Sequence, residues 1–563
     1  MLGRRVGELG NYKATTYIAA EFKRLGLKPA GDNGGYFQNL AYGPAEFDIA
    51  TSKLIAGSAT LAPGRDWIPI APSTANGIGA KADLSNVQVV FAGKWRDTSV
   101  VLDPAMFKGK IAVFTSNAAN AGLIVAGRGA ARVLRCDSVP DKFGADAAAR
   151  VEAAVRADSV AGRGGRGGGA AGGGGRGGAG GAGRDMRAQT AGAVAVLIIS
   201  TDSIPAAALT SAFNGRNSLQ SAFPTPAAGS LGAGAITPAA AERLFGKPVD
   251  QLSVGAAGQS VSAAWNYDWH ISKTPARNVV AILPGTDPTR AAEYVLISAH
   301  NDHNGINPVA VDHDSLRAFN IVTRPQGAND PLCRPTDEQQ HRIDSLIARA
   351  RSIRPPRRDS IMNGADDDGS GTAVLLEIAE KFASEKPARS IIFVSHTGEE
   401  SGLLGSRWFT DHPTIPLASV AAALNMDMVG KGRTDQVKFG GPTSIQMLGS
   451  RRLSRPFGDI IDSVNATRTE TMSIDRSWDV SANPMNRFCR SDQVNYVHHD
   501  VPVTYFSLGY AEDYHQPTDE PQYIDYDHAA RLGRFIHDIA WAISQRKDRP
   551  AITGADPSYP VCR

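Results

Sequence analysis

The sequence predicts an α/β protein whose mixed, largely parallel sheet is covered by helices, with an inserted mostly-β module. After Ala264, continuous apolar runs such as YVLIS and SIIFVS alternate with helical patterns such as GTAVLLEIAEKFA. Strands buried on both faces read as unbroken apolar runs, and intervening helices are typical of parallel crossovers. From about Asp48 to Ser262, short Val- and Ile-rich runs are instead separated by Gly, Pro and Asp, which favours a mostly-β fold.

The length of 563 residues predicts more than one domain, because a single hydrophobic core rarely grows so large. We expect an N-terminal helical segment at 1–47 that packs on the α/β domain, followed by the β-rich module at 48–262. The α/β domain should cover 263–548, with an insertion at 305–362. A tail at 549–563 should close the chain.

The first element is an amphipathic helix. Residues Tyr12 to Leu27 place Ala, Ile, Phe and Leu at helical spacing, and the pattern stops at Gly26, before Pro29. Such a helix needs a partner surface for its apolar face, and the α/β domain can supply one.

A glycine- and arginine-rich run occupies about Gly162 to Arg184, inside the β-rich module. It has too few apolar side chains to offset the entropy of ordering it, so we expect a disordered loop. An RNA-binding role is the alternative for such a composition, but a glycine expansion in a surface loop explains it more simply.

Charge and hydropathy exclude two classes of partner. Lys and Arg number 59 against 56 Asp and Glu, a formal net charge of +3, and no basic stripe stands on a helical face, so no nucleic-acid partner is indicated. No run of about 18 apolar residues appears, so no membrane span is predicted. The N-terminus shows no signal peptide; a leader removed or missed upstream is a hypothesis.

The cysteines Cys136, Cys333, Cys489 and Cys562 are scattered. Without CxxC spacing they argue against a cysteine zinc cluster, and they permit two disulfides without requiring them.

Metal-compatible side chains gather where the predicted strands end. SAHND, HTGEE and NMDMVG each follow an apolar run, NGADDDGSG precedes a helix, and DYHQPTDE follows VPVTYFSLG. In an open α/β sheet, ligands bind beyond the carboxyl ends of the strands. We therefore expect these five clusters to meet at one rim.

Each cluster alone has an ordinary explanation, such as a helix N-cap aspartate or a solvated pair of glutamates. Their repetition at successive strand ends favours a site instead. Two imidazoles and three carboxylates suit zinc, and one carboxylate can bridge two ions. The candidate ligands are His300, Asp367, Glu400, Asp427 and His515.

The strings SAHND, GADDDGSG, TGEESGLLGS, NMDMVG and YHQPTDE resemble, in the same order, the signature blocks of metallopeptidase family twenty-eight, the co-catalytic zinc aminopeptidases. The N-terminal helix and β-rich module resemble the opening helix and protease-associated domain of many members. The resemblance implies a zinc exopeptidase fold, two zinc ions per chain, peptide substrates cleaved at the N-terminus, and a secreted or periplasmic location.

The resemblance also implies roles for the first residues of the site. His300 matches a ligand of one zinc ion, and Asp302 matches the carboxylate that orients its imidazole. Asp367 matches the bridging ligand, and in many relatives the peptide bond that follows it, here to Asp368, is cis.

Glu400 and Asp427 match the terminal carboxylate ligands, one per ion, and His515 matches the last imidazole. Glu399 matches the general base, because a glutamate that is free of the metal can carry the proton to the leaving amine. Tyr514 could donate to the oxyanion; packing at the sheet edge is the alternative.

Three features depart from the family pattern. The insertion at 305–362 is unusually long, contains the helical pattern TDEQQHRIDSLIARARS, and should cap the cleft and restrict substrates. His313 within it lies between two aspartates, but a solvated loop is favoured over a third metal site. Gln493 stands where the family has a histidine; the metal ligands lie elsewhere, so this difference concerns only a detail of the pocket. His498 and His499 are expected at the surface.

Other functions share these ligands. Carboxypeptidases acting on acidic dipeptides and glutaminyl cyclases with one metal belong to the same fold, and receptor-like relatives keep the architecture after losing their metals. The complete ligand set and Glu399 favour an enzyme over a receptor. The oligomeric state is not predicted.

Overall fold

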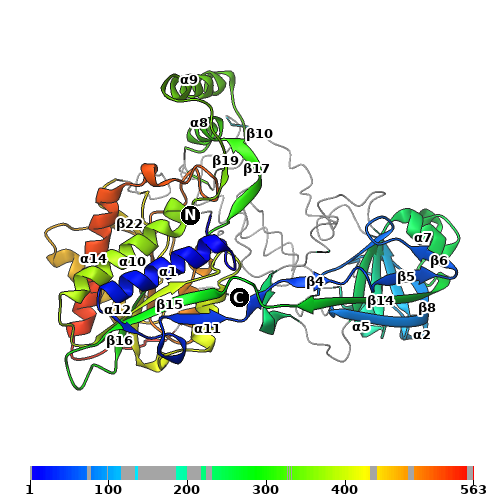
Figure 1. The fold of residues 1–563 in the computed structure, drawn as a ribbon, viewed down its shortest axis with the longest axis horizontal. Helices are drawn as coiled ribbons and strands as arrows, with labels where there is room; N and C mark the ends of the chain where they lie inside the picture. Colours follow the sequence, from blue (N-terminus) through cyan, green and yellow to red (C-terminus); the bar gives the residue numbers. More distant parts are fainter. Residues whose placement is uncertain are drawn as a thin grey trace. The chain divides into compact units, whose positions relative to one another are not determined.

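The computed structural model forms two compact units, each described here by itself (Figure 1). The first unit comprises Met1–Leu40, Val133–Gly180 and Thr274–Arg563, and the second comprises Ala41–Arg132 and Gly181–Lys273. The residues that the structure describes are 3–72, 78–97, 99–115, 134–136, 185–199, 213, 217–223, 231–325, 327–328, 330, 333–431, 441–479, 487–554 and 562.

The first unit is built on a nine-stranded mixed sheet with the path β1-β15-β20-β16-β21-β24-β22-β23, and β2 pairs with β15. β20, β16, β21 and β24 run parallel to one another, while β15 and β22 are antiparallel to their neighbours β20 and β24. The strands are β1 (Lys28–Pro29), β2 (Phe37–Leu40), β15 (Ala276–Leu283), β16 (Tyr294–His300), β20 (Ser390–His396), β21 (Val420–Met426), β22 (Ser444–Leu448), β23 (Ser473–Asp475) and β24 (Val503–Ser507).

Helices cover both faces of this sheet. Successive side chains of a strand point to opposite faces, so Val295 and Ile297 of β16 pack with one set of helices and Leu296 packs with the other. The first set is α1 (Leu9–Arg24), α10 (Gly371–Ala383), α12 (Arg455–Thr467) and α14 (Tyr526–Gln545); the second is α11 (Leu404–Asp411) and α13 (Gln493–His498). The predicted mixed, largely parallel sheet with helices on both faces is confirmed.

The N-terminal helix was also predicted correctly. α1 buries Ile18 and Phe22 in the core that lies under α10 and α14. It ends at Arg24, close to the expected stop at Gly26, whose φ of 75° suits the turn after a helix.

The insertion at 305–362 forms its own small substructure. β17 (Ile306–Asp312) and β19 (Arg358–Ile361) pair, α8 (His313–Thr323) follows β17, and α9 (Asp337–Ile353) packs on α8 (Figure 1). Thr336 caps α9 in a capping box with Gln339, as the TDEQQ pattern favours. β18 (Cys333–Arg334) pairs with β10 (Leu134–Arg135).

The second unit is mostly β. Its sheet follows the path β6-β5-β14-β8-β9-β11-β13-β7, with β4 on β14, and β3 pairs with β12. The glycine- and arginine-rich run at 162–184 lies outside the described residues. The elements are β3 (Tyr42–Gly43), β4 (Ala45–Phe47), β5 (Lys53–Ala56), β6 (Ala59–Leu61), β7 (Trp67–Pro69), β8 (Lys81–Lys94), α2 (Pro104–Phe107), β9 (Ile111–Thr115), α5 (Arg187–Thr190), β11 (Ala195–Ile199), β12 (Ser218–Leu219), β13 (Gly232–Ile236), α7 (Pro238–Phe245) and β14 (Ala257–Trp269).

The four cysteines form two disulfides, Cys136–Cys333 and Cys489–Cys562. The first joins β18 of the 305–362 insertion to the residue that follows β10, and the second joins the C-terminal tail to the segment before α13. Within the described residues, no helix combines the length and the apolar composition that crossing a membrane requires.

Candidate metal centre

The carboxyl ends of the parallel strands bring the candidate residues together. His300 is the last residue of β16 and is in register with His396, the last residue of β20. Glu399 and Glu400 lie in the turn after β20, which ends at His396, and Asp427 directly follows β21. His515 comes from the loop after β24. The rim predicted from the strand ends is therefore the place where these side chains meet.

Asp367 reaches the same rim from the loop before α10. Its neighbour Asp368 fixes that loop: the Asp368 carboxylate accepts hydrogen bonds from the backbone amides of Gly371 (2.9 Å), Met428 (3.0 Å) and His300 (3.1 Å). The peptide bond between Asp367 and Asp368 is cis, as the family resemblance implied. One buried carboxylate thus connects three of the loops that carry candidate ligands.

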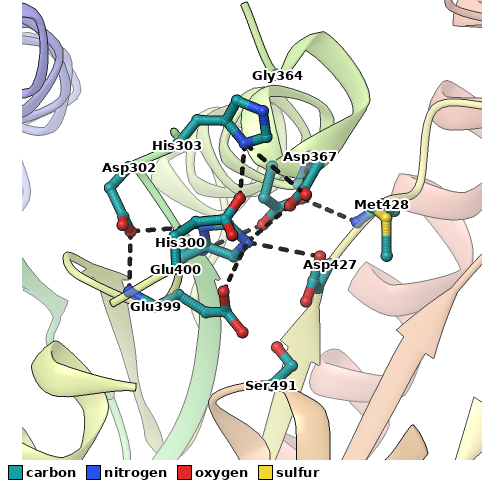
Figure 2. Close-up of polar contacts among 12 residues, drawn as sticks. His300, Asp302, His303, Gly364, Asp367, Glu399, Glu400, Asp427, Met428 and Ser491 are labelled. Atoms are coloured by element: carbon teal, nitrogen blue, oxygen red, sulfur yellow. Dashed lines mark hydrogen bonds and ion pairs between the residues drawn. The ribbon is translucent and has the colours of Figure 1, made fainter. Parts of the chain in front are cut away.

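The candidate ligands form two groups that share Asp367 (Figure 2). In the first, His300 Nε2 lies 3.2 Å from Asp367 Oδ1 and 3.5 Å from Asp427 Oδ1. In the second, His515 Nε2 lies 2.9 Å from Asp367 Oδ2 and 2.9 Å from Glu400 Oε2. Asp367 therefore offers one oxygen to each group.

The donor set fits zinc. Two ligand atoms at about 2.0–2.1 Å from a tetrahedral ion lie about 3.3 Å apart, close to the spacing within both groups. Both ring nitrogens of His300 and Oδ1 of Asp427 are buried and form no hydrogen bond with another described residue. Buried polar atoms of this kind are normally satisfied, and a bound ion would satisfy them.

The pKa shifts of His300 and Asp367 also favour a bound cation. Burial opposes the charged imidazolium of His300, but the nearby Asp302, Asp367 and Asp427 raise its pKa well above the ordinary value. Burial opposes the Asp367 carboxylate too, yet its close contacts with the His300 and His515 imidazoles hold its pKa well below the usual range. This concentration of buried negative charge favours a bound cation.

A further histidine belongs to the second group and was missed in the sequence. His303 Nδ1 lies 2.7 Å from Glu400 Oε1 and 3.7 Å from Asp367 Oδ2 (Figure 2). It stands three residues after His300 in HNDH, and the resemblance assigned no role to it. A second imidazole directly after the His300 motif was the signal that could have identified it.

Asp302 and Glu399 lie next to the first group. Asp302 Oδ1 accepts a hydrogen bond from the Glu399 amide at 3.0 Å and lies 3.6 Å from His300 Nδ1. Glu399 Oε2 lies 4.0 Å from His300 Nε2. Burial raises the pKa of Glu399 well above its ordinary value, and Asp427 and Glu400 raise it further. A glutamate with a raised pKa is suited to accepting a proton.

Two tyrosine rings and an arginine lie next to His515 of the second group. The Tyr514 ring stacks on His515 at 3.7 Å and lies 4.8 Å from the Tyr510 ring, and the Arg490 guanidinium lies 4.7 Å over the Tyr510 ring. Electrostatic interactions with Tyr510 raise the pKa of Arg490. No described carboxylate pairs with this cation.

Two long-range contacts hold the ligand loops. The Arg4 guanidinium donates to the backbone carbonyls of Asn301 (3.0 Å), Gly364 (2.7 Å) and Asn363. The N-terminal segment thus connects the loop after β16 to the loop of Asp367.

The second contact is a buried ion pair. Lys431 Nζ lies 2.7 Å from Asp513 and 2.6 Å from Asp519. The Asp519 carboxylate also accepts the amide hydrogens of Asp366 and Asp367 at 3.1–3.2 Å.

The other histidines considered in the sequence analysis lie elsewhere. His313 is buried, not solvated as expected: Nε2 lies 2.7 Å from Glu520, and Nδ1 lies 3.3 Å from Asp314. His499 lies 3.3 Å from the exposed Asp411, and His498 contacts the Cys562 carbonyl at 2.8 Å. Gln493 accepts a hydrogen bond from Asn425 at 3.0 Å and lies in the core.

Comparison with known proteins points to one family. Residues 343–540 match the model of Peptidase family M28, which confirms the resemblance expected from the motifs over that range. A probable zinc metalloprotease of Pyrenophora teres f. teres is 27% identical over 208 residues, which are 34% of this chain and 43% of that protein. A vacuolar membrane protease of Candida glabrata is 36% identical over 99 residues, 17% of this chain and 10% of that protein. The matches span less than half the length of these relatives.

Similar solved structures include aminopeptidases. The aminopeptidase from Aneurinibacillus sp. strain AM-1 has a TM-score of 0.40 at 15% identity, covering 99% of this chain and 93% of that chain. The zinc aminopeptidase BSAP from Bacillus subtilis has a TM-score of 0.42 at 16% identity, covering 98% and 95%.

Proposed function

Because residues 343–540 carry the family M28 match, we propose that this chain is a zinc-dependent exopeptidase, an aminopeptidase that removes N-terminal residues from peptides. The observation that carries the proposal is the sharing of Asp367 by two groups of buried ligands. His300 and Asp427 complete one position, and Glu400 and His515 complete the other. A carboxylate between two such positions is the arrangement of a two-metal hydrolase.

Zinc ions held there would polarise the scissile carbonyl and make water a better nucleophile. The protein's own part is to hold the ligands and to move a proton. Glu399 lies beside the first position without belonging to it, so its carboxylate is free to accept a proton from water and to deliver it to the leaving amine. Asp302, which accepts the Glu399 amide hydrogen, positions this glutamate.

The proposal is tested by metal analysis combined with a substrate panel. We expect two zinc ions per chain, hydrolysis of amino-acid anilides and unblocked peptides, and loss of that activity on chelation with recovery on adding zinc. Cleavage of N-blocked peptides alone would contradict the aminopeptidase assignment. One metal per chain together with cyclisation of N-terminal glutamine would instead favour a glutaminyl cyclase.

Arg490 supports a second candidate, a carboxypeptidase or dipeptidase. It is a partly buried cation beside Tyr510 and Tyr514, and its electrostatic interaction reaches Glu399. Such a cation is suited to binding the carboxylate of a substrate.

The variant Arg490→Gln discriminates the two candidates. If substrates present a carboxylate there, the variant raises KM at least about tenfold, the loss of one charged hydrogen bond, with kcat little changed. An aminopeptidase acting on neutral anilides should keep its KM. Equal effects on acidic and neutral substrates would contradict carboxylate recognition.

We also propose that the protein works in an oxidising compartment, secreted or periplasmic, and that the β-rich unit is a protease-associated domain. The two disulfides support the first point, because such bonds are rare where thiols are kept reduced. Mass spectrometry of the natively produced protein without reduction should find both Cys136–Cys333 and Cys489–Cys562 linked.

A further inference from the structure

His303 stands out among the buried side chains near the centre. Its side chain has no exposed surface, and both ring nitrogens lack a hydrogen bond to any other described residue. A buried imidazole normally donates from one nitrogen and accepts at the other. We propose that His303 is a metal ligand, the fourth protein ligand of the position formed by Asp367, Glu400 and His515, and this inference rests on the proposed metal centre.

The geometry supports ligation through Nδ1. This nitrogen lies 2.7 Å from Glu400 Oε1 and 3.7 Å from Asp367 Oδ2, and one atom from each of the four residues falls within 4.8 Å of the others. Two ligand atoms of one tetrahedral ion lie about 3.3 Å apart, so the separation from Asp367 is close to that spacing, whereas the contact with Glu400 is shorter than it. The His303 and His515 rings meet edge to face, with centroids 5.4 Å apart, so both can point at the same place.

Gly364 leaves space for the His303 ring. Its φ is 56°, and a Cβ added there would lie 2.4 Å from Cγ and 2.6 Å from Cδ2 of His303. Real Cβ atoms do not approach so closely, so any other residue at 364 would displace the imidazole. The backbone thus leaves space for this side chain beside Asp367.

With His303 as a ligand, the two metal positions differ in their number of protein ligands. With His303, the second position has four protein ligands, which is the number in closed structural zinc sites, whereas His300, Asp367 and Asp427 give the first position only three. A three-ligand site keeps a place for water or substrate. Glu399 lies on that side, 4.0 Å from His300, where a proton carrier is needed. The four-ligand position should therefore fill first and bind more tightly.

Metal titration of the apoprotein tests this asymmetry. Calorimetric titration with Zn²⁺ should give two sites of different affinity in the unchanged chain. His303→Gln should weaken the tighter site by more than about 100-fold, the upper end of what losing an outer partner of a ligand costs. His499→Gln, which removes an exposed histidine paired with Asp411, is the matched control and should leave both sites unchanged.

His303→Cys gives a direct spectroscopic readout. The four native cysteines are all in disulfides, so a thiolate ligand can come only from the new side chain. Loading this variant with Co²⁺ should produce a sulfur-to-cobalt charge-transfer band that the unchanged protein and His499→Cys lack. The band requires a folded site, so a variant that fails to fold cannot mimic it.

The outcomes separate the inference from the proposed function. Unchanged Zn²⁺ affinities in His303→Gln, or Co²⁺ binding to His303→Cys without the band, would overturn ligation by His303 while leaving a two-metal peptidase intact. Weakening of 100-fold or less would assign His303 to the hydrogen bonding of Glu400 and also overturn ligation. Absence of metal binding in the unchanged chain would overturn the proposed function itself.

Discussion

Glu399 and Glu400 are neighbours in sequence whose surroundings differ. Glu400 lies between His303 and His515, at 2.7 and 2.9 Å, whereas the Glu399 carboxylate lies 4.0 Å from His300. Glu399→Ala should therefore retain both metals and lose turnover, by about 10²–10⁴-fold or more, which is the usual contribution of a general base.

The test measures metal content by elemental analysis and kcat on the same Glu399→Ala preparation. Glu400→Ala is the matched control, because it should lose metal together with activity. A fully active Glu399→Ala protein would exclude the role of general base, and loss of metal from it would assign Glu399 to the ligands instead.

Lys431 pairs with two carboxylates of the loop that carries His515. It is a buried cation between Asp513 and Asp519, and Asp519 in turn holds the Asp366 and Asp367 amides. Lys431→Met leaves these carboxylates buried without their counterion, which typically costs about 3–5 kcal/mol. We expect a drop of that size in the unfolding free energy, measured by urea denaturation of the apoprotein.

Arg534→Met is the control for Lys431→Met, since Arg534 and Glu470 form an exposed pair. Exposed pairs contribute about 0–1 kcal/mol. Equal small losses in the two variants would contradict a supporting role for Lys431.

Among the larger elements, the 305–362 insertion is attached to the loop that carries His515. Asn320 of α8 donates to Gln516 at 2.6 Å, Arg324 donates to the Glu512 carbonyl at 3.2 Å, and His313 lies 2.7 Å from Glu520. These contacts come from α8 and its C-cap residue, whereas α9 packs on α8 through Ile343. α8 is therefore the attachment, and α9 is the part that can serve as a cap.

Replacing α9 by a short Gly-Ser linker should separate attachment from capping. We expect activity on single-residue anilides to persist and kcat/KM on longer peptides to rise relative to it, because a barrier at the cleft is removed. A series of peptides of increasing length gives the ratio. An unchanged length preference would contradict the capping hypothesis.

The sequence predicted the elements that follow from periodicity and chemistry. Apolar runs located β16, β20, β21 and β24, and polar residues at their ends located the rim where His300, Glu400 and Asp427 meet. It did not assign His303, because the HNDH motif offers a second imidazole without saying which side chains converge, and that depends on the turn at Gly364. The burial of His313 was missed for a similar reason, since its partner Glu520 is 207 positions further along the chain.

At the scale of the whole molecule, each of the two units has buried apolar clusters of its own. The first unit buries its apolar side chains between the mixed sheet and its helices, and the second buries Trp67, Trp265 and Tyr267 within its own sheet. All candidate ligands belong to the first unit. Metal binding should therefore stabilise one unit and not the other.

Calorimetry with and without a chelator tests that expectation. Binding to the native state stabilises it by about 4 kcal/mol at a free metal concentration 1,000 times Kd, so the metal-loaded protein should show two transitions, of which chelation lowers one by several degrees. Asp427→Ala serves as the control, because it removes a ligand of the first position and should shrink the chelator shift. A single transition, or equal shifts in both, would mean that the two units unfold together.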